Sequence, residues 1–120
     1  MEINIGQAKG RTYVEGKQGC LIVQEERDVL DLLAECGQND TQLLMLHHEN
    51  INPDFFDLKT GFAGTVLQKF STYYMKAALV VDMDRIKSER FKELIYECNK
   101  GGNIRFCKER SEAEDWLVSG

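Results

Sequence analysis

Leu43-Leu44-Met45-Leu46 is a run of four consecutive apolar residues, and a second apolar run follows at Ala77-Ala78-Leu79-Val80-Val81. Strands that are covered on both faces show such unbroken runs, whereas strands with one solvent-exposed face alternate between apolar and polar residues. Between the two runs, a helix is predicted from about Thr60 to Thr72. Its apolar positions, spaced by four, are Phe62, Val66 and Phe70. The stretch 43–81 therefore predicts a β-α-β unit within a buried parallel sheet.

Helical patterns flank this unit on both sides. Before it, a helix is predicted from about Glu25 to Cys36, and Gly37 is expected to end it. After it, a helix is predicted to begin after Ser88, a capping residue, and to end at Gly101. The apolar stripes of these two helices are Val29, Leu32, Leu33 and Cys36, and Phe91, Leu94, Ile95 and Cys98. Each helix therefore has one face to bury against the sheet.

The two ends of the chain complete the pattern. A β-hairpin is predicted around the Lys9-Gly10 turn, followed by a short strand at Cys20–Val23. At the other end, Asn103–Cys107 reads as a strand, and Ser111–Glu114 reads as a capping box before a short last helix with Trp116 and Leu117. The predicted fold class is α/β, with an N-terminal hairpin leading into a mostly parallel sheet with about four helices. Residues 1–120 are expected to form a single domain.

Composition disfavours several classes of protein. The net charge of −5 disfavours binding to nucleic acid or anionic lipid, because both need a basic surface. The four cysteines form no Cys-x-x-Cys pair, so they are interpreted as small buried residues in a reducing compartment. No signal peptide and no apolar run long enough to cross a bilayer is present in the sequence. We therefore expect a cytoplasmic protein without a metal or a cofactor.

The carboxyl edge of the predicted sheet is where ligands usually bind in such folds. His47 and His48 follow one strand and Asp82 follows the next, and the stretch between His47 and Thr60 is the longest loop. A histidine with Asp57 or Asp82 is one hypothesis for a hydrolase-type enzyme. The alternative is that the aspartates form turns or caps, while one histidine packs and the other meets solvent. Adjacent strand residues point to opposite faces, which disfavours a shared metal ion.

The segment Lys59-Thr60-Gly61 and the nearby Gly64 lie at the start of a predicted helix. Glycine in a helix costs about 1 kcal/mol relative to alanine, so its presence needs a reason. One explanation is tight packing of the helix on the sheet. Another is the close approach of a ligand or of another backbone at a helix start that can hold an anion.

The segment Asn52–Gly64 also carries a resemblance, together with Leu67-Gln-Lys-Phe-Ser-Thr-Tyr-Tyr-Met-Lys and Ile95-Tyr-Glu-Cys-Asn-Lys-Gly. With these motifs the chain resembles, over nearly its whole length, a small bacterial family known only as a domain of unknown function, family 4180. This resemblance implies no activity.

More distantly, the layout is similar to the STAS domains of anti-anti-sigma factors and to their lipid-binding, SpoIIAA-like relatives. STAS domains have an Asp-Ser-Ser-Gly-Leu-Gly loop that starts a helix and is phosphorylated by a partner kinase. Asp57–Gly64 occupies the same place, with Thr60 directly before Gly61. The loop is longer, Leu58-Lys59 has no hydroxyl group, and the acceptor would be a threonine. The resemblance implies a phosphorylation switch at Thr60.

Three hypotheses follow for function. The first is a non-enzymatic regulatory or protein-interaction module of STAS-like architecture, with Asp54, Asp57, Lys59, Thr60, Gly61 and Gly64 as binding or switch residues. The second is a SpoIIAA-like binder of a small ligand or lipid, with an apolar pocket between Phe55-Phe56 and the sheet. The third is the enzyme described above, with His47, His48 and Asp82 at the sheet edge. A protein partner is expected, and a homodimer through Tyr73, Tyr74 and Trp116 is a further hypothesis.

Overall fold

Strand β2 (Arg11–Gly16) pairs in two ways, which decides how the sheet is built. In the computed structural model, which describes residues 1–119, β2 pairs antiparallel with β1 (Ile3–Ala8) and parallel with β3 (Leu43–His47). The sheet continues in parallel through β4 (Lys76–Val80) and β5 (Ile104–Cys107). The strand order is β1-β2-β3-β4-β5. The predicted α/β class, with a hairpin leading into a mostly parallel sheet, is confirmed.

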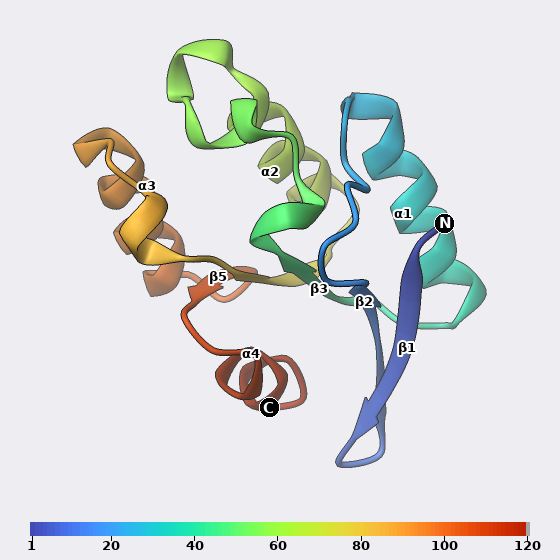
Figure 1. Ribbon diagram of the computed structural model, residues 1–120. Coiled ribbons are helices and arrows are strands. Elements are labelled where there is room, and N and C mark those ends of the chain that lie inside the picture. The colour runs from blue at the N-terminus through green and yellow to red at the C-terminus, as the bar shows by residue number, and fades with distance from the viewer. Residues whose placement is uncertain (120) are drawn as a thin grey trace.

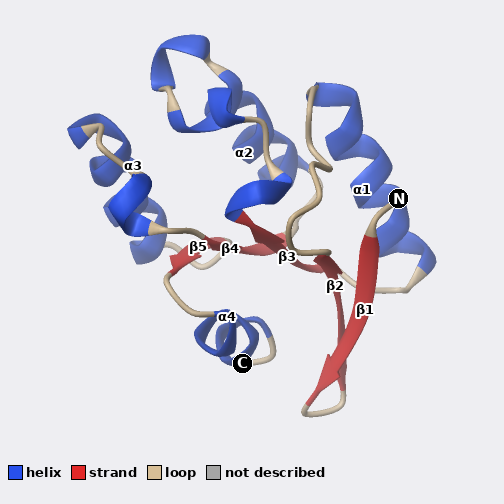
Figure 2. Ribbon diagram, viewed as in Figure 1, coloured by secondary structure: helices blue, strands red, loops and turns tan. Residues whose placement is uncertain are grey.

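The α-helices of the described chain are divided unequally between the two faces of the sheet. Helices α1 (Glu26–Gln38), α2 (Phe62–Thr72) and α3 (Glu89–Lys100) cover one face, and α4 (Arg110–Leu117) covers the other (Figures 1 and 2). Each of the first three helices connects two neighbouring parallel strands, and every connection steps in the same direction across the sheet. Because such connections are right-handed, they place these three helices on one face.

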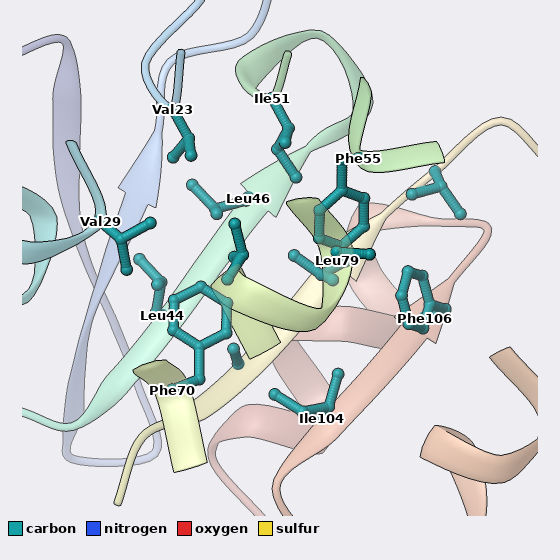
Figure 3. Packing of buried hydrophobic residues seen from close by; sticks show 14 of the residues in the cluster. Val23, Val29, Leu44, Leu46, Ile51, Phe55, Phe70, Leu79, Ile104 and Phe106 are labelled. Carbon is teal, nitrogen blue, oxygen red and sulfur yellow. The ribbon is translucent and has the colours of Figure 1, made fainter. Parts of the chain in front are cut away.

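The side chains of β3 alternate between two hydrophobic cores. Leu44 and Leu46 lie in the larger core under α1, α2 and α3, parts of which Figure 3 shows. Leu43 and Met45 lie in the smaller core, where Leu117 of α4 packs. Both faces of β3 are therefore buried, as its unbroken apolar run predicted.

The predicted strand at Cys20–Val23 is wrong. This segment is a loop in which Val23 forms one isolated parallel bridge with Ile51. The backbone N–H groups of Ile22 and Val23 both donate to the carbonyl of Asn50, at 2.8 Å. β2 already lies beside β3, so the place in the sheet that this segment would need is occupied by the hairpin itself.

Helix α1 runs through Gly37, which was predicted to end it. Asp40 adopts the left-handed conformation instead, with φ +54°, and the N–H of Thr41 donates to the carbonyl of Cys36 at 3.1 Å. Aspartate tolerates this conformation better than most residues do. The helix therefore continues to Gln38, and the left-handed residue that follows its cap Asn39 is an aspartate rather than a glycine.

The predicted capping box at Ser111 is also wrong, because α4 begins at Arg110 and Ser111 lies within its first turn. Glu112 accepts from the N–H of Lys108 at 3.3 Å. Glu114, the predicted second half of the box, turns toward the sheet and accepts a hydrogen bond from the hydroxyl of Tyr13. A tertiary contact thus uses the carboxylate that the local pattern assigned to a cap.

Helix α3 has the ends that its sequence predicts. Ser88 accepts from the N–H of Phe91 at 3.2 Å, and Gly101 is the C-terminal cap.

The four cysteines are free thiols, and burial raises the pKa of Cys36 to about 12 and that of Cys107 to about 11. Within residues 1–119, no helix has the length and apolar character that crossing a membrane requires.

Candidate functional site

The segment that leads into α2 consists of two successive 3₁₀ turns, Pro53–Phe56 and Leu58–Thr60. Side chains immediately before the turns cap them. The Oδ1 of Asn52 accepts from the N–H of Asp54 at 3.0 Å, and the Oδ1 of Asp57 accepts from the N–H of Lys59 at 3.1 Å. Asn and Asp commonly shape turns in this way. The local sequence therefore builds a defined loop, not an irregular one.

Aromatic side chains anchor this loop to the larger core. Phe55 is fully buried, and Figure 3 shows it in the same core as Phe106. Its ring centroid lies 5.7 Å from that of Phe91 and 6.4 Å from that of Phe106. Phe56 stacks on His48 with a centroid distance of 4.2 Å. The space between the Phe55-Phe56 segment and the sheet is thus filled by packed rings, where the ligand-binding hypothesis expected an apolar pocket.

Thr60 joins the two turns to the start of α2. Its Oγ1 lies 2.7 Å from the carbonyl oxygen of Asp54 and 2.9 Å from that of Asp57, and it accepts from the N–H of Phe62 at 3.2 Å. The residue is exposed. A single accessible hydroxyl group therefore connects both turns with the helix.

Gly61 and Gly64 face open space. Gly61 has φ +78°, and a Cβ built at either glycine meets no neighbouring heavy atom within 4 Å. The explanation of Gly64 by tight helix–sheet packing is therefore wrong. The exposed candidate residues of this segment, here named the α2-entry surface, are Asp54, Asp57, Lys59, Thr60, Gly61 and Gly64.

The other candidates lie in an open hollow of about 510 Å³ at the carboxyl ends of the parallel strands. Its lining includes His47, His48, Asp82 and Lys108. A second hollow of about 310 Å³ lies beside Phe56. Both are lined by Gly19, His48 and Glu49. The structure therefore brings together the histidines and Asp82, but not Asp57.

His48 and the two aspartates do not converge as an acid–base pair. The Nδ1 of His48 accepts from the backbone N–H of Asp82 at 3.1 Å, while the carboxylate of Asp82 caps the N–H of Asp84 at 3.0 Å. Burial, and then the nearby Arg85, lower the pKa of His48, which favours the neutral ring. Among residues 1–119, His48 therefore forms no hydrogen bond to the carboxylate of Asp57 or Asp82, which the enzyme hypothesis requires of it.

His47 belongs to a buried polar group on the α4 face of the sheet, which sequence reasoning missed. The Nε2 of His47 lies 2.7 Å from the Oε2 of Glu15. Arg110 donates to both carboxylate oxygens of Glu15, from Nε at 2.8 Å and from Nη2 at 2.7 Å, and its Nη2 also donates to the hydroxyl of Tyr13 at 2.9 Å. With Glu114, which accepts from Tyr13, these residues form what we name the Glu15 cluster.

The charges of the Glu15 cluster are mutually satisfied. Glu15 and His47 are each only 7% exposed. Burial alone would raise the pKa of Glu15, but the hydrogen bonds from Arg110 and His47 outweigh burial and hold that pKa below its ordinary value. The cluster joins β2, β3 and the first turn of α4, so removal of one partner would leave another charged group buried without compensation.

A family model described as a domain of unknown function, DUF4180, matches residues 8–117. No curated protein and no solved structure shows a significant match to the chain. Because the family model covers most of the sequence, including the α2-entry surface and the Glu15 cluster, the chain belongs to the DUF4180 family.

Proposed function

We propose that this chain is a non-enzymatic interaction module that binds a protein partner through the α2-entry surface. The outward-facing Gly64 carries the proposal. Gly64 lies in a helix, where glycine costs about 1 kcal/mol relative to alanine, and no internal contact offsets that cost. A partner whose backbone approaches α2 closely would explain why a side chain is missing there.

The rigidity of the surface supports the same proposal. The buried ring of Phe55 anchors the loop to the core. The side chains of Asn52 and Asp57 accept hydrogen bonds from backbone N–H groups of the turns. A surface that is ordered before binding loses less conformational entropy when a partner binds. At the neighbouring strand ends, the Nδ1 of His48 and the carboxylate of Asp82 each accept from a backbone N–H of the chain, which favours recognition over catalysis.

Thr60 is the position where modification would change this surface. Its hydroxyl hydrogen is donated to the carbonyl oxygens of Asp54 and Asp57, and a phosphate ester has no such hydrogen. A phosphate on Thr60 would also lie close to Asp57. The N-terminal end of α2 would attract the negative charge of the phosphate. Phosphorylation would thus rearrange the two turns, in analogy with the STAS domains that the loop resembles.

Substitution of Gly64 tests the interaction surface. Gly64→Arg places a long side chain over α2, and Gly37→Arg is a matched control on α1, since Gly37 is also exposed, helical and without neighbours within 4 Å. Both variants should unfold at nearly the temperature of the unmodified protein. Proteins that co-purify from the native host should be lost with Gly64→Arg and kept with Gly37→Arg. Equal partner recovery with both variants would contradict the proposed surface.

Thr60→Glu and Thr60→Ser test the switch. The serine variant keeps a hydroxyl group, so it should retain partner binding, whereas the glutamate variant should change it. Hydrogen exchange should be faster at residues 54–60 in the glutamate variant. Identical binding and identical exchange in both variants would remove Thr60 as the switch but would leave the interaction surface in place.

A second candidate function, the binding of a small ligand, is favoured by the two hollows at the carboxyl edge. The one beside Phe56 is lined by apolar atoms of Leu21, Ile51 and Pro53, next to the ion pair of Glu49 and Arg85. Native mass spectrometry of protein from its own host would reveal a retained molecule. Leu21→Trp, at an exposed position on the rim, should displace that molecule without unfolding the protein.

A further inference from the structure

The two edges of the sheet differ in whether their outward backbone groups are protected. On the β5 edge, the side-chain amide of Asn99 bonds both outward backbone groups of Phe106: its Oδ1 accepts from the N–H at 2.8 Å, and its Nδ2 donates to the carbonyl at 3.2 Å. A residue of α3 thus blocks this edge against another strand, one of the ways in which proteins protect exposed edges.

The β1 edge carries no such protection. Figures 1 and 2 show β1 along the outer side of the sheet. Its register with β2 runs through six consecutive pairs without a bulge, and Ile3–Ala8 contains neither a charged residue nor a proline. Charges, prolines and bulges are the usual means of protecting an edge, so an open edge of this kind is suited to pairing with another strand.

The pairing with β2 determines which backbone groups of β1 point outward. The carbonyl of Glu2 accepts from the N–H of Lys17 at 3.0 Å, so the even-numbered residues of β1 face β2. In an antiparallel pair, hydrogen bonding alternates from residue to residue. The backbone groups of Ile3, Ile5 and Gln7 therefore face away from the sheet, with Ile5 in the middle. The N–H of Ile3 donates to the carbonyl of Met1 at 2.9 Å, so pairing at that residue would exchange this local bond for one to the new strand.

We propose that β1 pairs antiparallel with β1 of a second copy of this chain, with the two-fold axis at Ile5. The two Ile5 residues then lie opposite each other, and Ile3 of each copy lies opposite Gln7 of the other. Every outward residue meets an outward residue, and the two five-stranded sheets become one. This inference concerns the β1 edge of the sheet, whereas the α2-entry surface follows the central strand β3, and it does not depend on the proposed function.

The charges at the ends of β1 favour a second copy as the occupant. The charged residues that flank the strand are Glu2 at its start and Lys9 at its end. Antiparallel pairing brings Lys9 of each copy to the Glu2 end of the other, so opposite charges meet at both ends. Parallel pairing would bring like charges together, which disfavours it.

Exposed apolar side chains lie beside the same edge. Met1 is 51% exposed, Ile5 is 48% exposed and Leu21 is 54% exposed. Met1 and Leu21 line an open hollow of about 570 Å³ with Ala34 of α1. A second copy on β1 would cover Ile5 with its own Ile5 and would add apolar burial beside the new strand pair.

Sedimentation velocity of the purified full chain tests the pairing. The unmodified protein should be a dimer at about 100 µM, since specific interfaces commonly have dissociation constants well below that concentration. Ile5→Pro removes the outward N–H without removing a hydrogen bond to β2, and edge strands accept proline at such positions. Ile5→Lys instead places two like charges on the axis. Each variant should weaken dimerisation at least about 100-fold, because the substituted residues of both copies meet at the two-fold axis.

Tyr74→Lys is the control, because Tyr74 is the most exposed large apolar residue outside this edge. It should leave the dimer intact. Hydrogen exchange gives a second readout: the amides of Ile5 and Gln7 should gain protection as concentration rises, while the amides of Asn4 and Gly6 should be protected throughout. A monomeric unmodified protein, a dimer that survives both Ile5 substitutions, or a dimer that only Tyr74→Lys disrupts would each overturn the proposal.

Discussion

The Glu15 cluster and the α2-entry surface are both rich in polar residues, yet the structure uses them in opposite ways. In the cluster, each oxygen of the buried carboxylate of Glu15 has a partner within the chain. On the α2-entry surface, the polar side chains cap their own turns, and the two glycines leave the outer side open. The saturated buried group joins elements of the fold, whereas the exposed surface with its outward glycine is the one for which we propose recognition. The residue types alone do not separate the two.

The largest effect is expected from Glu15→Ala. The substitution leaves His47 buried without its partner and Arg110 without its bidentate acceptor. Breaking a buried ion pair in this way costs about 3–5 kcal/mol, here at the lower end because Arg110 reaches solvent. Urea denaturation would measure the loss. Glu97→Ala, which breaks an exposed pair with Lys100, is the control and should cost less than about 1 kcal/mol.

The pH dependence of stability sharpens this prediction. The pKa of Glu15 is lower in the folded protein than its ordinary value of 4.5. The stabilisation that ionised Glu15 provides is therefore complete above pH 4.5 and is lost as the pH falls through the folded pKa. In Glu15→Gln, the decline in stability below pH 4.5 should be shallower. Parallel pH profiles of the two proteins would show that Glu15 is not ionised in the way that the cluster implies.

Gly16→Ala should be nearly as damaging, without changing any charge. A Cβ at Gly16 would lie 2.8 Å from the Cγ of Asn50 and 2.9 Å from the Cδ1 of Ile22, and closer still to the Oδ1 of Asn50. That oxygen accepts from the N–H of His47 at 2.6 Å, and Asn50 is fully buried, so it has no room to move. Overpacking of this kind costs about 1–3 kcal/mol, measurable by thermal denaturation. Gly37→Ala, in open space, should not lower stability.

A smaller loss is expected from Thr60→Ala on the α2-entry surface. The variant loses the hydroxyl that connects Asp54, Asp57 and Phe62. Since the site is exposed, the expected cost is about 1 kcal/mol. Thr60→Ser should recover most of it. A loss as large as that of Glu15→Ala would mean that Thr60 belongs to the core of the fold and is not a switch.

A small gain in stability is expected from Gly64→Ala. The new methyl group meets open space, and alanine favours a helix over glycine by about 1 kcal/mol. The melting temperature should therefore rise slightly while partner binding falls. A gain in stability with unchanged binding would leave the glycine without a functional explanation.

Local patterns predicted most of the fold but not the partners of polar side chains. The hairpin turn, the unbroken strands and the stripe of α3 depend on neighbours in the sequence, so they could be read directly. The strand expected at Cys20–Val23 failed because its place beside β3 is taken by β2, which depends on pairing between distant segments. The cap predicted at Glu114 is wrong for the same reason: its partner, Tyr13, lies in a distant segment of the sequence.

The sequence by itself determined the α/β class, the two-sided burial of β3 and the capped turns before α2, because spacing and turn residues act over a few positions. Only the tertiary structure decided that Glu15, His47 and Arg110 meet. Tyr13 and Glu15 share one face of β2 by alternation, but nothing in the sequence says that α4 folds onto that face. Likewise, the outward direction of Gly64 and the unequal edges of the sheet depend on which elements lie beside them, a property of the packed chain and not of any single segment.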